Sequence, residues 1–231
     1  MSKINIYIDG PSENEMNDLF DMDISGFTFN PTLFKSLGVK DYLGYSQKIQ
    51  KLSNGLPISL EVVGDTYEEM VFQGKKLASL GSNVFVKIPI TYTSGESTIE
   101  VIKTLSMEGI NLNITAIFTF LQIKEVLPTL KNTNSIFSVF AGRLYDIGID
   151  AKEFMKEMSL YIHENSRCKI LWASPRMHYD VITAQSSNCD IITMTNSMYK
   201  KMSLLGKTPE EYSLETVKMF FNDAQVSGYK F

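Results

Sequence analysis

Short runs of aliphatic and β-branched residues alternate with longer stretches of helical periodicity along most of this chain. The short runs predict eight strands, at residues 4–9, 26–30, 58–63, 84–90, 112–117, 135–140, 169–174 and 190–195. Most of these runs are apolar at successive positions, as residues 84–90 illustrate. Strands of this kind are typical of a parallel sheet that is covered on both faces.

The stretches between the predicted strands have the spacing of helices, and the clearest lie at 66–80, 97–107, 120–130, 150–164 and 177–185. In the first of them, Met70, Leu77 and Leu80 fall near helical spacing, while Asp65 and Thr66 are suited to cap its start. A strand followed by a helix, repeated eight times, predicts an α/β fold of the (β/α)8 TIM-barrel type.

No linker rich in Pro, Gly or Ser divides the chain, so the sequence predicts a single barrel domain over residues 1–231. Residues 208–226 predict an additional terminal helix, because Thr208 and Glu211 have capping-box spacing and Pro209 occupies the first helical position. This helix is amphipathic. Its apolar face requires a surface, which either the barrel or a neighbouring subunit has to supply.

Composition narrows the classes of partner. The formal net charge of -4 argues against a nucleic-acid-binding protein, which needs a basic surface. No run of about 18 apolar residues and no signal-peptide pattern occur, so we expect a cytoplasmic protein without a membrane partner. The two cysteines, Cys168 and Cys189, and the two histidines, His163 and His178, lack the spacing of zinc ligands. We therefore expect no metal and no disulfide framework.

Side chains at the carboxyl ends of barrel strands converge on one mouth, so polar residues there are candidates for catalysis. These residues are Asp9, Asn30, Glu61, Lys87, Asn113, Thr115, Ser138 and Ser174.

Lys87 is the most informative of them, because it lies between Val86 and Ile88 in a central strand. Desolvation lowers the pKa of a lysine amine from about 10.4 toward 7–8 and makes the amine nucleophilic. A lysine that reaches solvent or forms an ion pair fits the same pattern. The spacing alone leaves these alternatives open.

Six segments of the chain resemble motifs of the transaldolase family, which includes the short fructose-6-phosphate aldolases. In chain order they are Ile6-Tyr7-Ile8-Asp9, Gly26-Phe27-Thr28-Phe29-Asn30-Pro31-Thr32, Val86-Lys87-Ile88-Pro89, Asn113-Ile114-Thr115-Ala116, Phe140-Ala141-Gly142-Arg143 and Ala173-Ser174-Pro175-Arg176. The matches extend from the first predicted strand to the seventh. The resemblance implies a Schiff-base enzyme that acts on phosphorylated sugars without a cofactor.

The resemblance also implies roles for individual residues. Lys87 forms the imine, Asp9 transfers a proton at a substrate hydroxyl, and Glu61 acts with Thr115 through a bound water. Substrate-binding roles go to Asn30 and Asn113 at the sugar hydroxyls, to Ser138, Arg143 and Arg176 at the phosphate, and to Ser174. The residues alone leave other roles open, since Asp9 is also suited to a cap, Asn30 to a turn before Pro31, and either arginine to the surface.

Two residues bear on the branch of the family. The simple aldolases tend to have glutamine at the position of Glu61 and tyrosine at that of Phe140. The resemblance thus favours transfer of dihydroxyacetone from sedoheptulose 7-phosphate or fructose 6-phosphate to an aldose phosphate. An aldolase, or a specialised enzyme acting on another ketose, is the alternative. A sugar-phosphate-binding protein without activity is a third, less favoured reading.

The chain departs from the family pattern at Gly10, Phe29 and Pro175. Phe29 and Pro175 adjoin the expected pocket, where they are able to change substrate choice. Members of the family form decamers or dimers, so we also expect a homo-oligomer.

Overall fold

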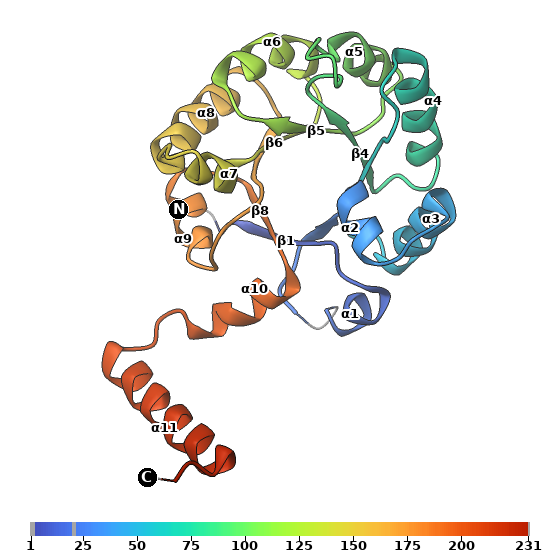
Figure 1. Cartoon of the computed structure of the whole chain (residues 1–231). Coiled ribbons are helices and arrows are strands. Elements are labelled where there is room, and N and C mark those ends of the chain that lie inside the picture. The colour runs from blue at the N-terminus through green and yellow to red at the C-terminus, as the bar shows by residue number, and fades with distance from the viewer. Residues whose placement is uncertain (1–2, 20–21, 231) are drawn as a thin grey trace.

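The computed structural model describes residues 3–19 and 22–230. Its strands run parallel and form a closed barrel in sequence order, with the last strand pairing back to the first (Figure 1). They are β1 (Asn5–Asp9), β2 (Gly26–Thr28), β3 (Ile58–Glu61), β4 (Val84–Pro89), β5 (Leu112–Ile117), β6 (Ile136–Val139), β7 (Lys169–Trp172) and β8 (Ile191–Met194). The predicted (β/α)8 barrel is confirmed.

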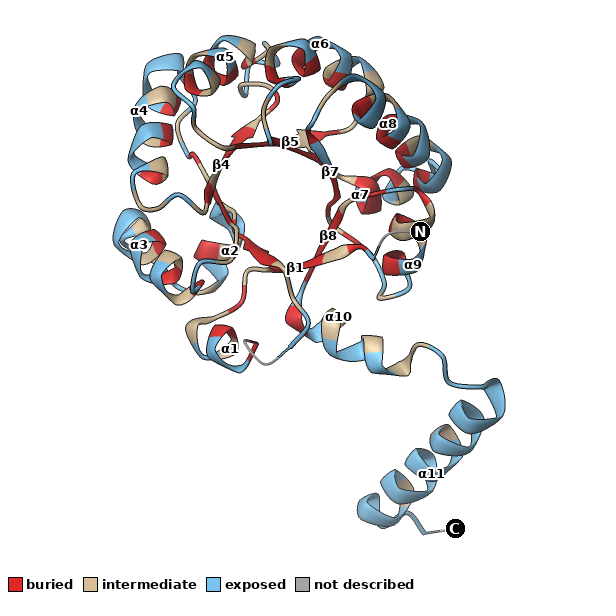
Figure 2. Cartoon of the chain, turned by 180° about the vertical axis from the view of Figure 1, so that it is seen from behind, coloured by how far each residue is buried: buried red, intermediate tan, exposed pale blue. Residues whose placement is uncertain are grey.

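The helices of the chain, except the last one, cover the outside of the barrel, and their buried residues face the strands (Figure 2). They are α1 (Glu13–Asp18), α2 (Pro31–Ser36), α3 (Tyr42–Leu52), α4 (Tyr67–Ala78), α5 (Ile99–Met107), α6 (Phe120–Leu130), α7 (Ala141–Asp146), α8 (Ala151–Asn165), α9 (Asp180–Ser186), α10 (Asn196–Lys200) and α11 (Pro209–Ser227), with a 3-10 turn, η1 (Lys201–Leu204), between the last two. All five predicted helices are present within this set.

Among the predicted helices, α9 starts furthest beyond its predicted first residue. The segment 177–185 predicts a helix from its first residue, but α9 begins at Asp180. The buried Asp180 carboxylate accepts hydrogen bonds from the backbone N–H groups of Arg176 and Met177, at 2.6 and 3.2 Å. These bonds fix the preceding residues as a loop at the barrel mouth, where Arg176 is needed in the predicted site.

The barrel interior is filled below the mouth. Tyr7, Ile136, Leu171 and Ile191 form a buried cluster of their own, distinct from the larger core between strands and helices. Side chains two positions apart on a strand share a face, so Tyr7 lies directly beneath Asp9. The polar mouth therefore has an apolar floor.

The terminal helix α11 lies away from the barrel (Figure 1). Its cap is as predicted, since Thr208 and Glu211 form a capping box and Pro209 is at the first turn. All 19 residues of α11 are described, and none is buried (Figure 2). Within the described ranges, no helix combines the length and apolar character needed to cross a membrane.

Candidate active site

Lys87 lies on β4 with its side chain inside the barrel, and only 5% of the residue is exposed. Its Nζ is 3.0 Å from Glu61 Oε2 and 3.4 Å from the carbonyl oxygen of Phe29. The register of β3 and β4 places Glu61 directly beside Lys87. Of the alternatives left open by the sequence, the structure shows a buried, ion-paired amine.

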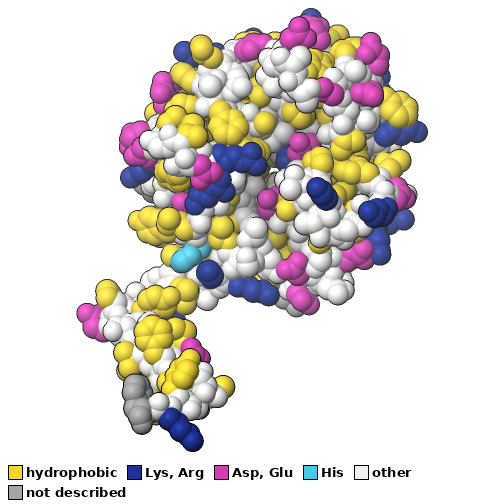
Figure 3. Space-filling model, viewed as in Figure 1, with side chains coloured by type: hydrophobic (Ala, Val, Ile, Leu, Met, Phe, Trp, Pro, Cys, Tyr) yellow, Lys and Arg dark blue, Asp and Glu magenta, His cyan; other side chains and the backbone are white. Residues whose placement is uncertain are grey.

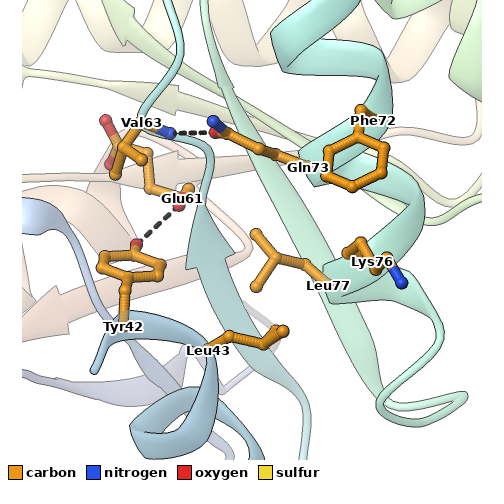
Figure 4. Close-up of a pocket in the computed structure, with 8 residues that line it drawn as sticks. All are labelled: Tyr42, Leu43, Glu61, Val63, Phe72, Gln73, Lys76 and Leu77. Atoms are coloured by element: carbon orange, nitrogen blue, oxygen red, sulfur yellow. Dashed lines mark hydrogen bonds between the residues drawn. The ribbon is translucent and has the colours of Figure 1, made fainter.

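The backbone at the end of β3 is held from outside the barrel. The Tyr42 hydroxyl on α3 donates to the Glu61 carbonyl oxygen at 2.5 Å, and Gln73 Oε1 on α4 accepts from the Val63 N–H at 2.7 Å (Figure 4). An apolar pocket between the two helices includes Leu43 and Leu77 (Figure 4). Both helices therefore fix the strand end that carries Glu61.

Asp9 ends β1 and lines the same cavity as Lys87. Desolvation inside the barrel mouth raises the pKa of the Asp9 carboxyl, while the Lys87 charge and a hydrogen bond from Thr28 oppose that rise. Asp9 Oδ1 accepts from the Thr28 hydroxyl at 2.6 Å. The next residue, Gly10, has φ of +60°, and a Cβ there would lie 2.7 Å from the Leu33 side chain. Glycine at this departure from the family pattern suits that conformation.

The two predicted amide side chains differ in position: Asn30 lies at the cavity and Asn113 lies behind its wall. Asn30 lines the cavity, and its Oδ1 also caps α2 by accepting from the Leu33 N–H at 2.9 Å. Asn113 is fully buried, where Nδ2 donates to the Ser59 hydroxyl at 3.0 Å and Oδ1 accepts from Ser138 at 2.6 Å. Asn113 thus supports the cavity wall through Ser138.

Thr115 on β5 also lines the cavity. Among the described residues its buried hydroxyl has no hydrogen-bond partner. The following residue, Ala116, has φ of 58°, and the pairing of β5 with β6 shifts register between Ile114 and Ile117. Such irregularities re-aim side chains at functional sites, and here the irregularity adjoins a hydroxyl that is free to bind a ligand.

The phosphate-binding candidates surround the ends of β6 and β7. Arg143 on α7 lines the cavity with its guanidinium 4.9 Å from the centre of the Phe140 ring. Ser174, with φ of 57°, also lines the cavity. Arg176 forms an ion pair with Asp146 and donates to Ser174 Oγ at 3.2 Å. The guanidinium of Arg176 is therefore held beside the cavity rather than in its lining.

Gly142 allows these two loops to meet. A Cβ at this position would lie 1.7 Å from the carbonyl oxygen of Ser174, a backbone atom. The Gly142 N–H also donates to the Ala173 carbonyl at 3.3 Å. The close approach explains why glycine precedes Arg143.

The structure brings most of the predicted residues to one mouth, where basic and acidic side chains lie beside a central hollow (Figure 3). The cavity is lined by Asp9, Thr28, Asn30, Lys87, Thr115, Ser138, Phe140, Arg143, Ala173, Ser174 and Thr193. Glu61 reaches it through Lys87, whereas Asn113 lies behind Ser138 and Arg176 lies on Asp146. In the described part of the chain, no three His, Cys, Asp or Glu residues form a group able to hold a metal ion.

Sequence reasoning missed two residues and misplaced one. Thr28 and Thr193 were not singled out, although a hydroxyl side chain within an apolar strand is a signal that would have found them. The expectation that the Phe29 side chain adjoins the pocket is wrong. Its ring is fully buried and packs edge-on against Phe34, with ring centres 5.6 Å apart. Only the carbonyl of Phe29 contacts Lys87.

Comparison with solved structures supports the fold. Dihydrodipicolinate synthase from Rhodopseudomonas palustris superposes with a TM-score of 0.57 at 11% identity, covering 83% of this chain and 69% of that one. An oxaloacetate acetylhydrolase gives 0.57 at 8% identity, with coverages of 99% and 84%. At such identities the similarity concerns the barrel architecture alone.

Sequence comparison is more specific. A protein of Bdellovibrio bacteriovorus named "Probable transaldolase" is 33% identical over 201 residues, covering 87% of each chain. A protein of Thermoplasma acidophilum with the same name is 36% identical over 191 residues, covering 81% of this chain and 82% of its own. The profile of the family described as transaldolase/fructose-6-phosphate aldolase matches residues 6–229. Nearly the whole chain is included in that match, and the chain belongs to the transaldolase/fructose-6-phosphate aldolase family.

Proposed function

We propose that this enzyme is a transaldolase that moves a dihydroxyacetone unit from a ketose phosphate to an aldose phosphate through a Schiff base on Lys87. The observation that carries this proposal is the buried Lys87 amine, 3.0 Å from the Glu61 carboxylate and lining one cavity with Asp9. Lysine amines in desolvated sites act as nucleophiles toward carbonyl groups. Family membership supports the same chemistry.

The reaction begins with proton transfer across the Lys87–Glu61 contact, which delivers a neutral amine. The amine attacks the ketose carbonyl carbon, and Glu61 returns a proton to the departing hydroxyl, so that water leaves and a protonated imine forms. Thr115, whose buried hydroxyl faces this cavity, binds the water that is released.

Asp9 then removes the proton from the substrate hydroxyl on the far side of the bond to be broken. The electron pair of that carbon–carbon bond moves into the imine, which gives an enamine on Lys87 and a free aldehyde. The enamine attacks the carbonyl of the acceptor aldose while Asp9 returns its proton to the new hydroxyl. Hydrolysis of the second imine restores Lys87 and releases the product.

The remaining cavity residues bind the donor. Asn30 hydrogen-bonds a sugar hydroxyl, Asn113 orients Ser138 from behind, and Ser138, Ser174 and Arg143 contact the phosphate. A guanidinium matches phosphate oxygens in bidentate geometry. Arg176 completes this set by exchanging Asp146 for the phosphate, a rearrangement that its partly exposed position permits.

Reductive trapping tests the proposal. Borohydride added with fructose 6-phosphate should attach the mass of the sugar or of its three-carbon fragment to Lys87. Lys87→Met should carry no such mass, whereas Lys75→Met, which removes an exposed lysine paired with Glu108, should label as the wild type does. An unlabelled wild type, or equal labelling of Lys87→Met, would reject the Schiff base at this position.

A fructose-6-phosphate-type aldolase is the second candidate. The family matched here includes both activities, and the pairing of Arg176 with Asp146 leaves only Arg143 among the phosphate-binding arginines in the cavity lining. Release of free dihydroxyacetone without an acceptor, measured beside transfer to an aldose phosphate, separates the two. We expect transfer to exceed release.

We further propose that the chain forms one barrel unit whose terminal helix α11 packs against a second copy in a homo-oligomer. The helix exposes a set of large apolar side chains (Figure 3), namely Tyr212, Leu214, Val217, Met219, Phe220, Phe221 and Val226. A helix with this many large apolar side chains and no buried residue is unusual for a monomer. The capping box and the Lys207–Glu215 ion pair hold the helix start in a defined form, which suits a preformed contact element.

A further inference from the structure

Two threonine hydroxyls, from the strands on either side of β1, form a chain of hydrogen bonds that ends at Asp9. Thr28 on β2 donates to Asp9 Oδ1 at 2.6 Å, and its Oγ1 is 2.5 Å from Thr193 Oγ1 on β8. β2 and β8 are the two strands that flank β1 in the closed barrel. Thr28 and Thr193 are 2% and 5% exposed, so this chain of hydroxyls is shielded from bulk water.

The number of protons fixes the direction of these hydrogen bonds. An ionised carboxylate only accepts, and each hydroxyl has one proton to donate. Because the Thr28 proton points to Asp9, the short contact between the hydroxyls requires Thr193 to donate to Thr28. Both protons therefore point toward the carboxylate. Such a chain is cooperative, since each bond polarises the next.

The residue type at both positions supports a role beyond packing. Barrel interiors usually contain branched apolar residues such as valine, which has nearly the shape of threonine. Burying a hydroxyl costs free energy unless it is hydrogen-bonded. Here the two hydroxyls form hydrogen bonds with each other and with one carboxylate oxygen of Asp9.

We propose that Thr193 and Thr28 are positioning residues that hold Asp9 Oδ1 as a permanent acceptor, so that Oδ2 is the oxygen that exchanges the substrate proton. This inference rests on the proton-transfer role of Asp9 in the proposed function. Proton uptake by Oδ2 leaves the Thr28 bond to Oδ1 in place, so the carboxyl group does not have to rotate between cleavage and addition. The hydroxyl pair also stabilises the ionised form that accepts the proton.

Two other charges act on Asp9 from neighbouring strands. Lys87 on β4 favours the ionised carboxylate, and Glu61 on β3 opposes it. Both remain in place when a threonine is replaced, so the contribution of the hydroxyls can be measured separately.

The test is the titration of Asp9 in the full, substrate-free protein, followed by carbon-13 NMR of labelled aspartate carboxyls and assigned with Asp9→Asn. Thr28→Val should raise the pKa of Asp9 by about one unit, because it removes a hydrogen bond to a charged group. Thr193→Val should raise it by a smaller amount, while Thr28→Ser and Thr193→Ser should restore the wild-type titration. In the pH profile of kcat/KM, the acidic limb should shift to higher pH in the same order, more in Thr28→Val than in Thr193→Val.

Thr133→Val is the matched control. Its hydroxyl donates to the Leu130 carbonyl at 2.8 Å near the amino end of β6, far from the mouth, so its loss should not change the Asp9 titration. An unchanged Asp9 titration in folded Thr28→Val and Thr193→Val, or an equal shift in Thr133→Val, would overturn the proposal. If a valine variant does not fold, the alanine variant of the same residue, Thr28→Ala or Thr193→Ala, removes the same hydroxyl with a smaller side chain.

The outcome is distinguishable from a failure of the proposed function. A wild type without turnover would remove the catalytic role of Asp9, yet the titration of the substrate-free protein would still decide whether the hydroxyl pair acts on it. Normal trapping at Lys87 together with unshifted titrations would retain the function and reject the positioning role.

Discussion

At the scale of single residues, the site depends on charges that are largely buried and kept close together at the barrel mouth. Lys87 and Glu61 are neighbours on adjacent strands, so the barrel register alone brings amine and carboxylate to 3.0 Å. Removing one partner of a buried ion pair destabilises the protein, because the other charge is left uncompensated. The pairing therefore has consequences for both catalysis and stability.

Glu61→Gln should slow imine formation by about 10²–10⁴-fold, since the amide cannot take the lysine proton or return it. The measurement is the rate of borohydride-trappable adduct in a single turnover. Glu108→Gln is the control, because Glu108 pairs with Lys75 at 2.6 Å on the exposed surface. A trapping rate within threefold of wild type in Glu61→Gln would assign the proton transfer to another group.

Asp9 makes stability depend on pH in a direction opposite to most carboxylates. Desolvation raises its pKa above that of the unfolded chain, so the folded protein binds more protons between the two values. Its contribution to the free energy of unfolding is thus greatest below the unfolded pKa and is lost as pH rises through the folded pKa. Urea titrations should show the stability of Asp9→Asn, relative to wild type, increasing with pH through this window. Parallel stability profiles would contradict this prediction.

At the scale of elements, the barrel is closed by contacts between segments far apart in the chain. Glu15 in α1 accepts from Asn196 Nδ2 at the start of α10 at 2.8 Å, and it also completes the Ser12 capping box. These hydrogen bonds, that from Asn196 first, lower the pKa of Glu15. The two helices flank the meeting point of β1 and β8, so this carboxylate links the beginning of the chain to its end.

Asn196→Ala should lower the free energy of unfolding at pH 7 by about 1–2 kcal/mol, because it removes a hydrogen bond to a charged group. The contribution of Glu15 is present above its unfolded pKa and is lost as pH falls through its lower folded value. The difference between Asn196→Ala and wild type should therefore shrink in acid. Asn165→Ala is the control, since Asn165 donates to the neutral Tyr161 carbonyl and its effect should not vary with pH.

Gly142→Ala should destabilise the protein by about 1–3 kcal/mol and raise KM for a ketose phosphate, because its Cβ would overlap the Ser174 backbone. Thermal unfolding and steady-state kinetics measure the two effects. Gly74→Ala is the matched control: its Cβ would meet only the end of the flexible Leu105 side chain, at 2.7 Å. Equal behaviour of the two variants would show that the contact between the β6 and β7 loops has no special importance.

The elements differ in how well their sequences predict them. All eight strands were located, because each is a short apolar run. The helices α1, α2, α3, α7 and α10 were not identified. All of them except α3 have only five or six residues, which give little periodic signal. Most of their starts depend instead on caps such as Asn30, whose amide oxygen accepts the Leu33 N–H. Local hydrogen bonds, rather than an apolar stripe, define these segments.

At the scale of the whole molecule, the barrel is complete without α11, whereas α11 has no buried residue of its own. We expect deletion of residues 206–231, or the double change Phe220→Glu and Phe221→Glu, to leave a folded barrel. Its assembly in solution should contain fewer subunits than that of the wild type. Light scattering after size-exclusion chromatography measures this change. Met107→Glu alters another strongly exposed apolar residue and should keep the wild-type mass. An unchanged number of subunits in both α11 variants would show that α11 is not part of the interface.

The sequence by itself determined the barrel class and the order of its strands, and its ordered motifs supplied the candidate site residues, because hydrophobic period and motifs are local properties of the chain. Only the tertiary structure decided that Lys87 pairs with Glu61, that the Phe29 ring faces α2, and that Arg176 lies on Asp146. The Thr28–Thr193 pair likewise exists only because closure places β2 and β8 beside β1. Side-chain partners depend on distances across the barrel, and residue spacing along one strand does not contain them.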